Sequence, residues 1–305
     1  MTETILTAQH LDKIFPIKAQ LNNFFAGKRY HHAVSDVSLN LLEGETYSLV
    51  GESGSGKSTL GRLLIGLSKP DAGRIYYEGT DVLERTASGK DIRQQAVQIV
   101  FQNPFASLNP RKKIGAILEE TLAIYQLYDK SERRQVVQEM LEKVELQGFH
   151  ADRYPHELSG GQRQRVSIAR ALIADPKVLI CDEAVSALDV STQSQILRLL
   201  KQLQVEMNLT LFFITHDLGV ARSISNRIGI MYKGKIVEEG PSESVFSAPT
   251  HPYTQRLFDS IPVIPYLPAK TPAVKSSDVA SEVHLLSEEA FADRTAERHA
   301  VLKDA

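Results

Sequence analysis

The spacing of apolar residues divides the chain into a strand-rich beginning, a helical middle and a later part in which strands and helices alternate. Apolar residues alternate with polar ones over residues 5–15 and 34–41, which predicts two antiparallel strands because successive side chains of a strand point to opposite faces. The polar and aromatic stretch between them, residues 16–31, is interpreted as an inserted loop. A short apolar strand over residues 46–50 and a helix over residues 60–67 follow.

Between residues 112 and 147, apolar positions recur every three or four residues, which predicts helices with solvated charged faces. From Pro176 onward the expected elements alternate, and such alternation favours a parallel sheet covered by helices on both faces. Prolines interrupt any long element after Pro249, and we expect the polar segment 269–305 to be a mobile tail with one helix over 287–302.

The expected strands are 177–181, 209–215, 227–232 and 235–239, and the expected helices are 166–173, 192–207 and 218–223.

Composition and charge serve mainly to exclude classes of protein. A chain of 305 residues suggests two domains or one large domain with an appendage. Lys and Arg total 35 against 37 Asp and Glu, a near-balance that argues against a protein that coats nucleic acid. The single cysteine, Cys181, excludes an intrachain disulfide and a zinc cluster built from cysteines, and it is interpreted as a buried filler. No apolar run is long enough to cross a membrane and no secretory signal is evident, so we expect a cytosolic protein.

The strongest chemical signal is a glycine-rich segment between an expected strand and an expected helix. It fits the pattern G-x-x-x-x-G-K-[ST], in which curled backbone N–H groups and a helix N-terminus face phosphate oxygens. The lysine supplies a positive charge for the terminal phosphates, and the hydroxyl after it suits Mg²⁺. The residues expected to hold the nucleotide phosphates are Gly51, Glu52, Ser53, Gly54, Ser55, Gly56, Lys57, Ser58 and Thr59.

A second signal is the apolar strand that ends in Asp182 and Glu183. Two carboxylates at the end of a buried strand are costly unless a cation or ligand uses them. In a phosphate-loop protein the first acid holds Mg²⁺ and the second can orient and deprotonate an attacking water. Together with the phosphate loop, the pair predicts a nucleotide hydrolase.

The third signal is a serine and two glycines that open a helix, Ser159-Gly160-Gly161 followed by Gln162. This arrangement forms another exposed anion site, far along the chain from the phosphate loop. One nucleotide hardly needs two such sites from one subunit. We therefore expect two subunits, identical or related, to share each nucleotide across an interface.

In this order along the chain, the motifs resemble those of the ATP-binding subunit of an ABC transporter, up to about Pro268. Residues 158–162 resemble the signature of that family and residues 186–189, which end in Asp189, its D-loop. Residues 215–217 resemble the switch-histidine segment, and Gln102 resembles the Q-loop glutamine.

The resemblance implies an α/β fold: a RecA-like P-loop NTPase core with an N-terminal antiparallel β-subdomain and an inserted α-helical subdomain at about 103–175. The ATPase domain would span 1–248, a short C-terminal extension 249–268, and a flexible tail 269–305. ATP would lie between the phosphate loop of one subunit and the signature of the other.

The same resemblance assigns roles to single residues. Glu183 would be the catalytic base, and His216 would contact the γ-phosphate. Mg²⁺ would be held by Ser58, Gln102 and Asp182, and Asp189 would lie beside the nucleotide shared between the two subunits. An aromatic ring would stack on adenine, for which Phe15 is chosen and Tyr30 remains the alternative.

Two further segments narrow the subgroup. Residues 101–111 resemble the extended Q-loop of di- and oligopeptide importers, and their sequence is more similar to that of the second of the two paired ATPases in such importers. Residues 251–254 resemble the C-terminal extension of that group. Peptide is therefore the expected cargo, with nickel, opines or glutathione as alternatives. Some relatives carry a cysteine-bound iron–sulfur cluster in the extension, and none is expected here because the extension lacks cysteine.

The expected partners are transmembrane permease subunits, reached through a surface groove around residues 104–111, a second ATP-binding subunit and, indirectly, a solute-binding protein. No nucleic acid is expected, and the protein would lie peripherally on the cytoplasmic face of the inner membrane. Two rival functions are a soluble ABC protein that acts on ribosomes or DNA and a regulatory subunit that does not hydrolyse ATP. Neither the long insertions typical of the first nor a loss of Glu183 or His216 is seen.

Overall fold

The structure is a computed structural model that describes residues 3–17, 29–82, 93–103 and 107–259. The chain divides into two units, Met1–Ile261 and Pro262–Ala305, and all described residues belong to the first unit. The expected tail, its helix and the end of the expected extension lie outside the described residues.

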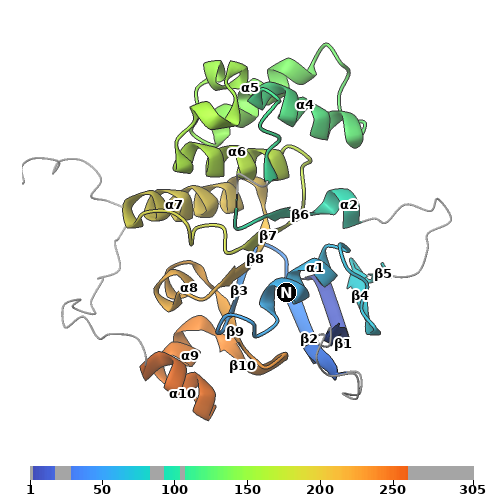
Figure 1. Ribbon diagram of the computed structural model, residues 1–305, viewed down its shortest axis with the longest axis vertical. Helices are drawn as coiled ribbons and strands as arrows, with labels where there is room; N and C mark the ends of the chain where they lie inside the picture. The colour runs from blue at the N-terminus through green and yellow to red at the C-terminus, as the bar shows by residue number, and fades with distance from the viewer. Residues whose placement is uncertain (1–2, 18–28, 83–92, 104–106, 260–305) are drawn as a thin grey trace, which may run out of the picture. The chain divides into compact units, whose positions relative to one another are not determined.

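A six-stranded sheet forms the centre of the described unit, with strand order β10-β9-β3-β8-β7-β6 (Figure 1). Neighbouring strands from β9 to β6 are parallel, as predicted, whereas β10 is antiparallel to β9. Every residue of β3, β7 and β8 is buried. The strands are β3 (Thr46–Val50), β6 (Val97–Val100), β7 (Val178–Asp182), β8 (Thr210–Thr215), β9 (Arg227–Tyr232) and β10 (Lys235–Pro241).

Both faces of this sheet are covered, because alternate side chains of each central strand enter different cores. Leu179 and Cys181 of β7 belong to a core on the side of helices α4 to α7. Ile180, between them, belongs to a second core with helix α1 and the N-terminal sheet. The helices are α1 (Lys57–Leu64), α4 (Ile114–Ile124), α5 (Arg133–Lys143), α6 (Gly160–Leu172), α7 (Val190–Met207) and α8 (Leu218–Ile224).

Cys181 is fully buried in the first of these cores, as its interpretation as a filler requires. Burial raises the pKa of its thiol to about 12, and the neighbouring Asp182 adds to the effect. The thiolate is therefore a minor form at neutral pH, and the side chain acts as a small apolar group.

A second, four-stranded antiparallel sheet has the order β2-β1-β4-β5. The predicted loop at residues 16–31 is wrong at both ends, since β1 continues through Pro16 and β2 already contains Tyr30, paired with it. Aromatic residues favour a pleated surface, so this polar stretch can extend the hairpin. The strands are β1 (Thr4–Ile17), β2 (Arg29–Leu42), β4 (Ala72–Tyr77) and β5 (Thr80–Asp81).

Two more differences from the predicted elements have local causes. Helix α1 ends at Leu64 rather than Leu67, because Gly66 adopts a left-handed conformation (φ 86°) that stops a helix and leaves Leu67 exposed. No helix was predicted at residues 252–259, yet Pro252 begins the short helix α10, and proline is favoured at a first helical position. The remaining short elements are α2 (Arg93–Ala96), η1 (Gly148–Asp152), η2 (Pro155–Glu157), α9 (Ser242–Ser247) and α10 (Pro252–Asp259).

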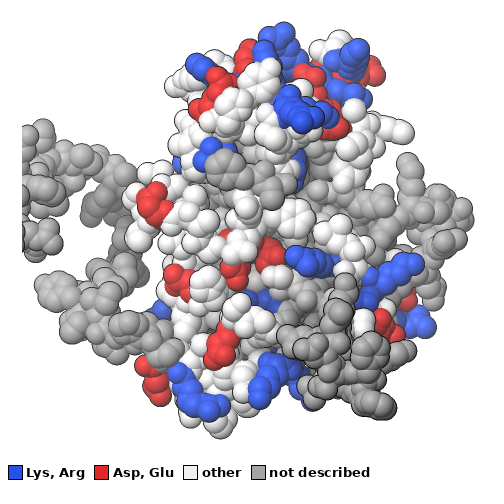
Figure 2. Space-filling model, in the orientation of Figure 1, with Lys and Arg blue, Asp and Glu red and all other residues white. Residues whose placement is uncertain are grey.

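Charged side chains are mixed over helices α4 and α5 on the face that Figure 2 shows. Ion pairs join Lys112 to Glu120 and Lys113 to Asp152 in this region. This described surface therefore does not gather one sign of charge in the way that nucleic-acid-binding surfaces do.

Candidate functional site

The loop between β3 and α1 carries the predicted phosphate-binding segment. Gly54 and Gly56 have φ angles of 81° and 111°, a region that favours glycine because it has no Cβ. A Cβ on Gly51 would lie 2.2 Å from the Met231 carbonyl oxygen, and one on Gly56 would lie 2.0 Å from that of Ala33. The loop therefore lies directly against β9 and β2, and it can curl this way only with glycine at these positions.

Lys57 begins α1 and is 4% exposed. Its Nζ donates hydrogen bonds to the carbonyl oxygens of Gly51 (2.7 Å) and Glu52 (2.8 Å). Burial lowers the pKa of Lys57, and the nearby carboxylates of Glu183 and Asp182 oppose that shift. The loop therefore holds the Lys57 ammonium group among its own carbonyls, away from bulk water. A positive charge in such a place interacts strongly with an anionic ligand.

Next to the lysine, the Ser58 hydroxyl donates a 2.7 Å hydrogen bond to Asp182 at the end of β7. Asp182 is 6% exposed, and burial raises its pKa against the opposing effect of the Ser58 bond. Among the described residues, no group of three or more His, Cys, Asp or Glu could hold a metal ion. Mg²⁺ usually takes one or two protein oxygens, substrate phosphates and water, so this hydroxyl–carboxylate pair fits Mg²⁺ that arrives with a polyphosphate.

Glu183 lies beside this pair with two polar neighbours. Gln102, just beyond β6, donates from Nε2 to Glu183 Oε2 at 2.7 Å, and His216, just beyond β8, has Nδ1 3.4 Å from Oε1. The backbone of Glu183 is left-handed (φ 49°) and its N–H donates to the Ile214 carbonyl at 3.0 Å. The ends of three neighbouring parallel strands therefore bring together a carboxylate, an amide and an imidazole, a set able to hold and deprotonate water.

The segment at the start of α6 forms a capping box. Ser159 Oγ accepts from the N–H of Gln162 (3.3 Å), and Gln162 Oε1 accepts from the N–H of Ser159 (2.9 Å). A Cβ on Gly161 would lie 2.6 Å from Thr192 Cγ2, so α6 begins close against α7. Among the described residues, no hydrogen bond or ion pair joins Ser159, Gly160, Gly161 or Gln162 to Lys57, Asp182 or Glu183.

Asp189 is the N-cap of α7. Its carboxylate accepts hydrogen bonds from the N–H of Thr192 (2.9 Å) and from the hydroxyls of Ser191 (2.6 Å) and Thr192 (2.8 Å). These bonds hold the pKa of Asp189 well below its usual range. Within one subunit this residue therefore acts as a helix cap, and no described contact joins it to the phosphate loop.

Both aromatic residues considered for adenine lie on the β1–β2 hairpin. Phe15 is 41% exposed, with Lys13 Nζ 5.6 Å from its ring centre, and Tyr30 is 55% exposed. Phe15 pairs with His31, two residues before Ala33, whose carbonyl faces Gly56 of the phosphate loop. Both rings are partly exposed, and the choice between them stays open.

One contact to the phosphate loop was not anticipated from the sequence. The N–H of Glu52 donates a hydrogen bond of 3.3 Å to the hydroxyl of Tyr253, 201 residues away. Neither periodicity nor motif spacing signals such a pairing, because it depends on where the C-terminal helix α10 folds back.

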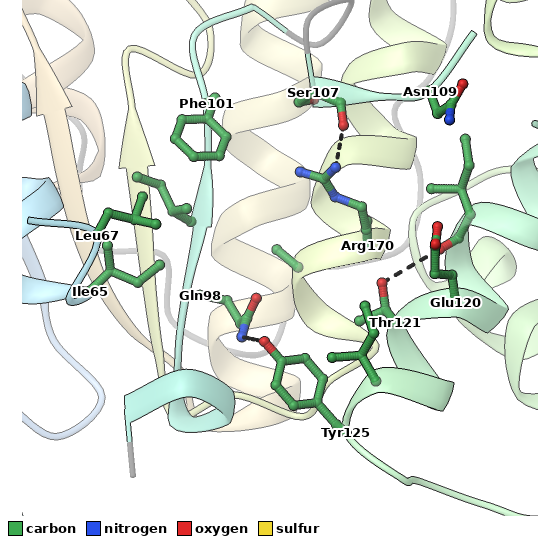
Figure 3. Close-up of a pocket in the computed structure, with 14 residues that line it drawn as sticks. Ile65, Leu67, Gln98, Phe101, Ser107, Asn109, Glu120, Thr121, Tyr125 and Arg170 are labelled. Carbon is green, nitrogen blue, oxygen red and sulfur yellow. Dashed lines mark hydrogen bonds between the residues drawn. The ribbon is translucent and has the colours of Figure 1, made fainter. Parts of the chain in front are cut away.

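A pocket of about 330 Å³ opens between the end of α1, strand β6 and helices α4 and α6 (Figure 3). Leu67 and Ile124 line it and are 59% and 68% exposed. Arg170 also lines it and donates to the Ser107 carbonyl, so it holds the chain beyond Gln102 at the rim. Of the groove expected around residues 104–111, residues 104–106 lie outside the described part of the chain, whereas Ser107 and Asn109 line this pocket.

Two family models match the chain. Residues 34–186 match the model described as ABC transporter. Residues 237–296 match the one described as oligopeptide/dipeptide transporter, C-terminal region.

Curated relatives agree with these matches. The dipeptide transport ATP-binding protein DppF of Escherichia coli is 48% identical over 86% of this chain and 78% of its own length. The oligopeptide transport ATP-binding protein AppF of Bacillus subtilis is also 48% identical, over 86% and 79%. The glutathione import ATP-binding protein GsiA of Pectobacterium atrosepticum is 46% identical over 86% of this chain but only 42% of its own length.

Solved structures have the same fold. The cassette CbiO1 of Clostridium perfringens, part of an ABC transporter complex, superposes with a TM-score of 0.68 at 28% identity and covers 80% of this chain and 91% of its own. The dimeric bacterial ABC transporter cassette MJ0796 gives a TM-score of 0.67 at 32% identity, over 78% of this chain and 99% of its own. A further structure of MJ0796 holds ADP and phosphate in a post-hydrolysis state.

Proposed function

We propose that this chain, which belongs to the ABC transporter family, is the ATP-hydrolysing subunit of an importer for di- and oligopeptides. The ATPase activity follows from family membership together with the site at the carboxyl ends of β3, β7 and β8. The single observation that favours peptide cargo is the match of residues 237–296 to the C-terminal region of oligopeptide and dipeptide transporters. The glutathione import relatives make glutathione the second candidate cargo.

In this proposal the phosphate loop binds the triphosphate of ATP. Lys57 leaves the carbonyls of Gly51 and Glu52, to which it now donates, and turns to the terminal phosphates. The curled backbone at Gly54 and Gly56 turns N–H groups toward the remaining phosphate oxygens. Ser58 and Asp182, with Gln102, would hold Mg²⁺, which when bound supplies positive charge against the phosphate oxygens.

Glu183 acts as the general base. Its carboxylate has a polar neighbour at each oxygen: Gln102 donates a hydrogen bond to Oε2, and His216 Nδ1 lies 3.4 Å from Oε1. These neighbours fix the direction in which the carboxylate points, so it can orient one water and take its proton. His216 is 54% exposed at its side chain, which leaves it free to contact the γ-phosphate.

The nucleotide is shared between two cassettes. In the described part of one subunit, no hydrogen bond joins the capping box at Ser159 to the phosphate loop. The N-terminus of the 13-residue helix α6 suits an anion. In the pairing we propose, Ser159 to Gln162 of one cassette face the phosphates bound by the other. ATP then favours the closed pair and hydrolysis releases it.

The pocket of Figure 3 is the proposed contact with the permease. Its exposed Leu67 and Ile124 offer apolar surface, and Ser107, which also lines it, follows Gln102 of the nucleotide site closely in sequence. Among the described residues, no helix combines the length and apolar character needed to cross a bilayer. We propose that the subunit lies on the cytoplasmic face of the membrane and is held there by this contact.

Substituting Ile124 by glutamate tests the permease contact. A buried isoleucine contributes about 1.5–3 kcal/mol, so placing a charge there should weaken retention of the permease more than tenfold in co-purification. Val205→Glu on α7 is the matched control, since Val205 is also an exposed aliphatic residue (83%) but does not line the pocket. If both variants retained the permease equally and still bound ATP, this pocket would not be the contact with the permease.

The cargo is tested by purifying the full chain with its membrane partners and solute-binding protein. ATP hydrolysis by the reconstituted complex should rise when the binding protein carries a di- or oligopeptide. If ATP hydrolysis rose only with glutathione, nickel or an opine, that compound and not peptide would be the cargo. Recovery of ribosomes or DNA ends in place of a permease would contradict transport altogether.

A further inference from the structure

The ring of Tyr253 lies in a fixed place beside the phosphate loop. Tyr253 is 4% exposed and belongs to a core that includes Val50, the last residue of β3, and Ile230 of β9. It stacks on Tyr232 with ring centres 4.1 Å apart. Tyr232 is preceded on β9 by Met231, and the Met231 carbonyl oxygen would lie only 2.2 Å from a Cβ added to Gly51. Strand β9 therefore contacts both the stacked rings and the phosphate loop.

The chain before α10 is anchored so that Tyr253 reaches this place. Glu238 on β10 accepts hydrogen bonds from the N–H and the hydroxyl of Thr250 (2.7 and 2.8 Å) and from the N–H of His251 (3.1 Å). His251 Nδ1 in turn accepts from the N–H of Tyr253 at 3.1 Å. A carboxylate that accepts several hydrogen bonds makes a strong local tie, so the start of α10 has little freedom to move.

Tyr253 holds one particular peptide of the phosphate loop. The Gly51–Glu52 peptide donates its N–H to the Tyr253 hydroxyl at 3.3 Å, while its carbonyl accepts from Lys57 Nζ at 2.7 Å. The two groups of a trans peptide point in opposite directions in one plane. The peptide is therefore held from both sides, by the nucleotide-binding lysine and by the C-terminal segment.

We infer that Tyr253 is a positioning residue for ATP binding, which fixes the Gly51–Glu52 peptide when Lys57 turns from it to the phosphates. This inference rests on the proposed role of Lys57. Once the lysine has left, the Tyr253 hydroxyl is the remaining side-chain hydrogen bond on that peptide among the described contacts. Glu238 and Tyr253 both fall within residues 237–296, so the C-terminal region contributes directly to the shape of the nucleotide site.

The test is Tyr253→Phe in the full chain, which removes the hydroxyl and keeps the stacked ring. Loss of one neutral hydrogen bond on the loop should raise the Kd and the KM for ATP about three- to tenfold. The kcat at saturating ATP should stay within about twofold and the Tm within about 2 °C, because the core around the ring is retained. Tyr232→Phe is the matched control, since it removes a hydroxyl from the other ring of the same stack, and its Kd should equal that of the wild type.

Each other result decides against the inference. An unchanged or lower Kd in Tyr253→Phe would show that the hydroxyl does not position the loop for ATP. If the Kd rose equally in both variants and the Tm fell, the weaker ATP binding would come from disturbed packing of the Tyr232–Tyr253 stack and not from the lost Tyr253 hydrogen bond. Failure of the proposed nucleotide site itself would be seen separately, as absence of ATP binding by the wild type.

Discussion

Replacing Glu183 by glutamine should abolish nearly all ATP turnover while leaving ATP binding intact. The amide cannot take a proton from water, and loss of a general base typically lowers a rate by about 10²–10⁴-fold. Lys57 and the loop are unchanged, so the Kd for ATP should stay within about twofold of the wild type. Phosphate release under saturating ATP and binding of a fluorescent ATP analogue measure the two quantities.

The same variant should accumulate as a closed pair of cassettes in ATP, because the ligand that favours closure is no longer consumed. Size-exclusion chromatography with and without ATP detects that shift. Glu206→Gln on α7 is the control, since the Glu206 carboxylate accepts a hydrogen bond from Gln202 on the same helix and, among the described residues, makes no contact with the nucleotide site. Wild-type turnover in the Glu183 variant would remove this residue from its proposed role.

Replacing Lys57 by alanine should weaken ATP binding by about 10- to 100-fold. A charge-assisted hydrogen bond to an anionic ligand is worth about 1.5–3 kcal/mol, and about 1.4 kcal/mol corresponds to a tenfold change in Kd. Burial makes this lysine a stronger partner than an exposed one, since electrostatic interactions are screened less away from bulk water. Isothermal titration with ATP and Mg²⁺ gives the Kd directly.

Lys201→Ala on α7 provides the comparison, because Lys201 also donates to a backbone carbonyl, that of Ser223, but lies outside the site. Its Kd for ATP should match the wild type. An equal Kd in the Lys57 variant would count against the phosphate-loop assignment.

The sheet and its helices could be predicted from the sequence because their signals are local. The buried strands β3, β7 and β8 appear as short apolar runs, and α7 shows helical periodicity over most of its length. The end of α1 was missed although its cause, Gly66, is local, whereas the error at the β1–β2 hairpin came from contacts between distant residues. The extension of β1 and β2 depends on the pairing of Pro16 with Tyr30, and hydrophobic spacing carries no signal for it.

The site divides in the same way. The phosphate loop and the Asp182–Glu183 pair are motifs, so their residues could be listed from the sequence, and parallel strands bring their ends to one edge. The roles of Gln102 and His216 came only from the resemblance to a family, and their approach to Glu183 is a finding of the structure. The contact of Tyr253 with Glu52 had no sequence signal, because it joins two segments through the return of a short proline-started helix.

The claim on which the proposed mechanism depends is that each ATP is enclosed by two cassettes. Determining the structure of the Glu183→Gln variant with ATP and Mg²⁺, paired with itself or with its related subunit, tests this claim most directly. We predict that Ser159 and Gly161 of one cassette will face the terminal phosphate bound at Lys57 of the other. Nucleotide held by one cassette alone, with residues 159–162 in solvent in every assembly, would contradict it.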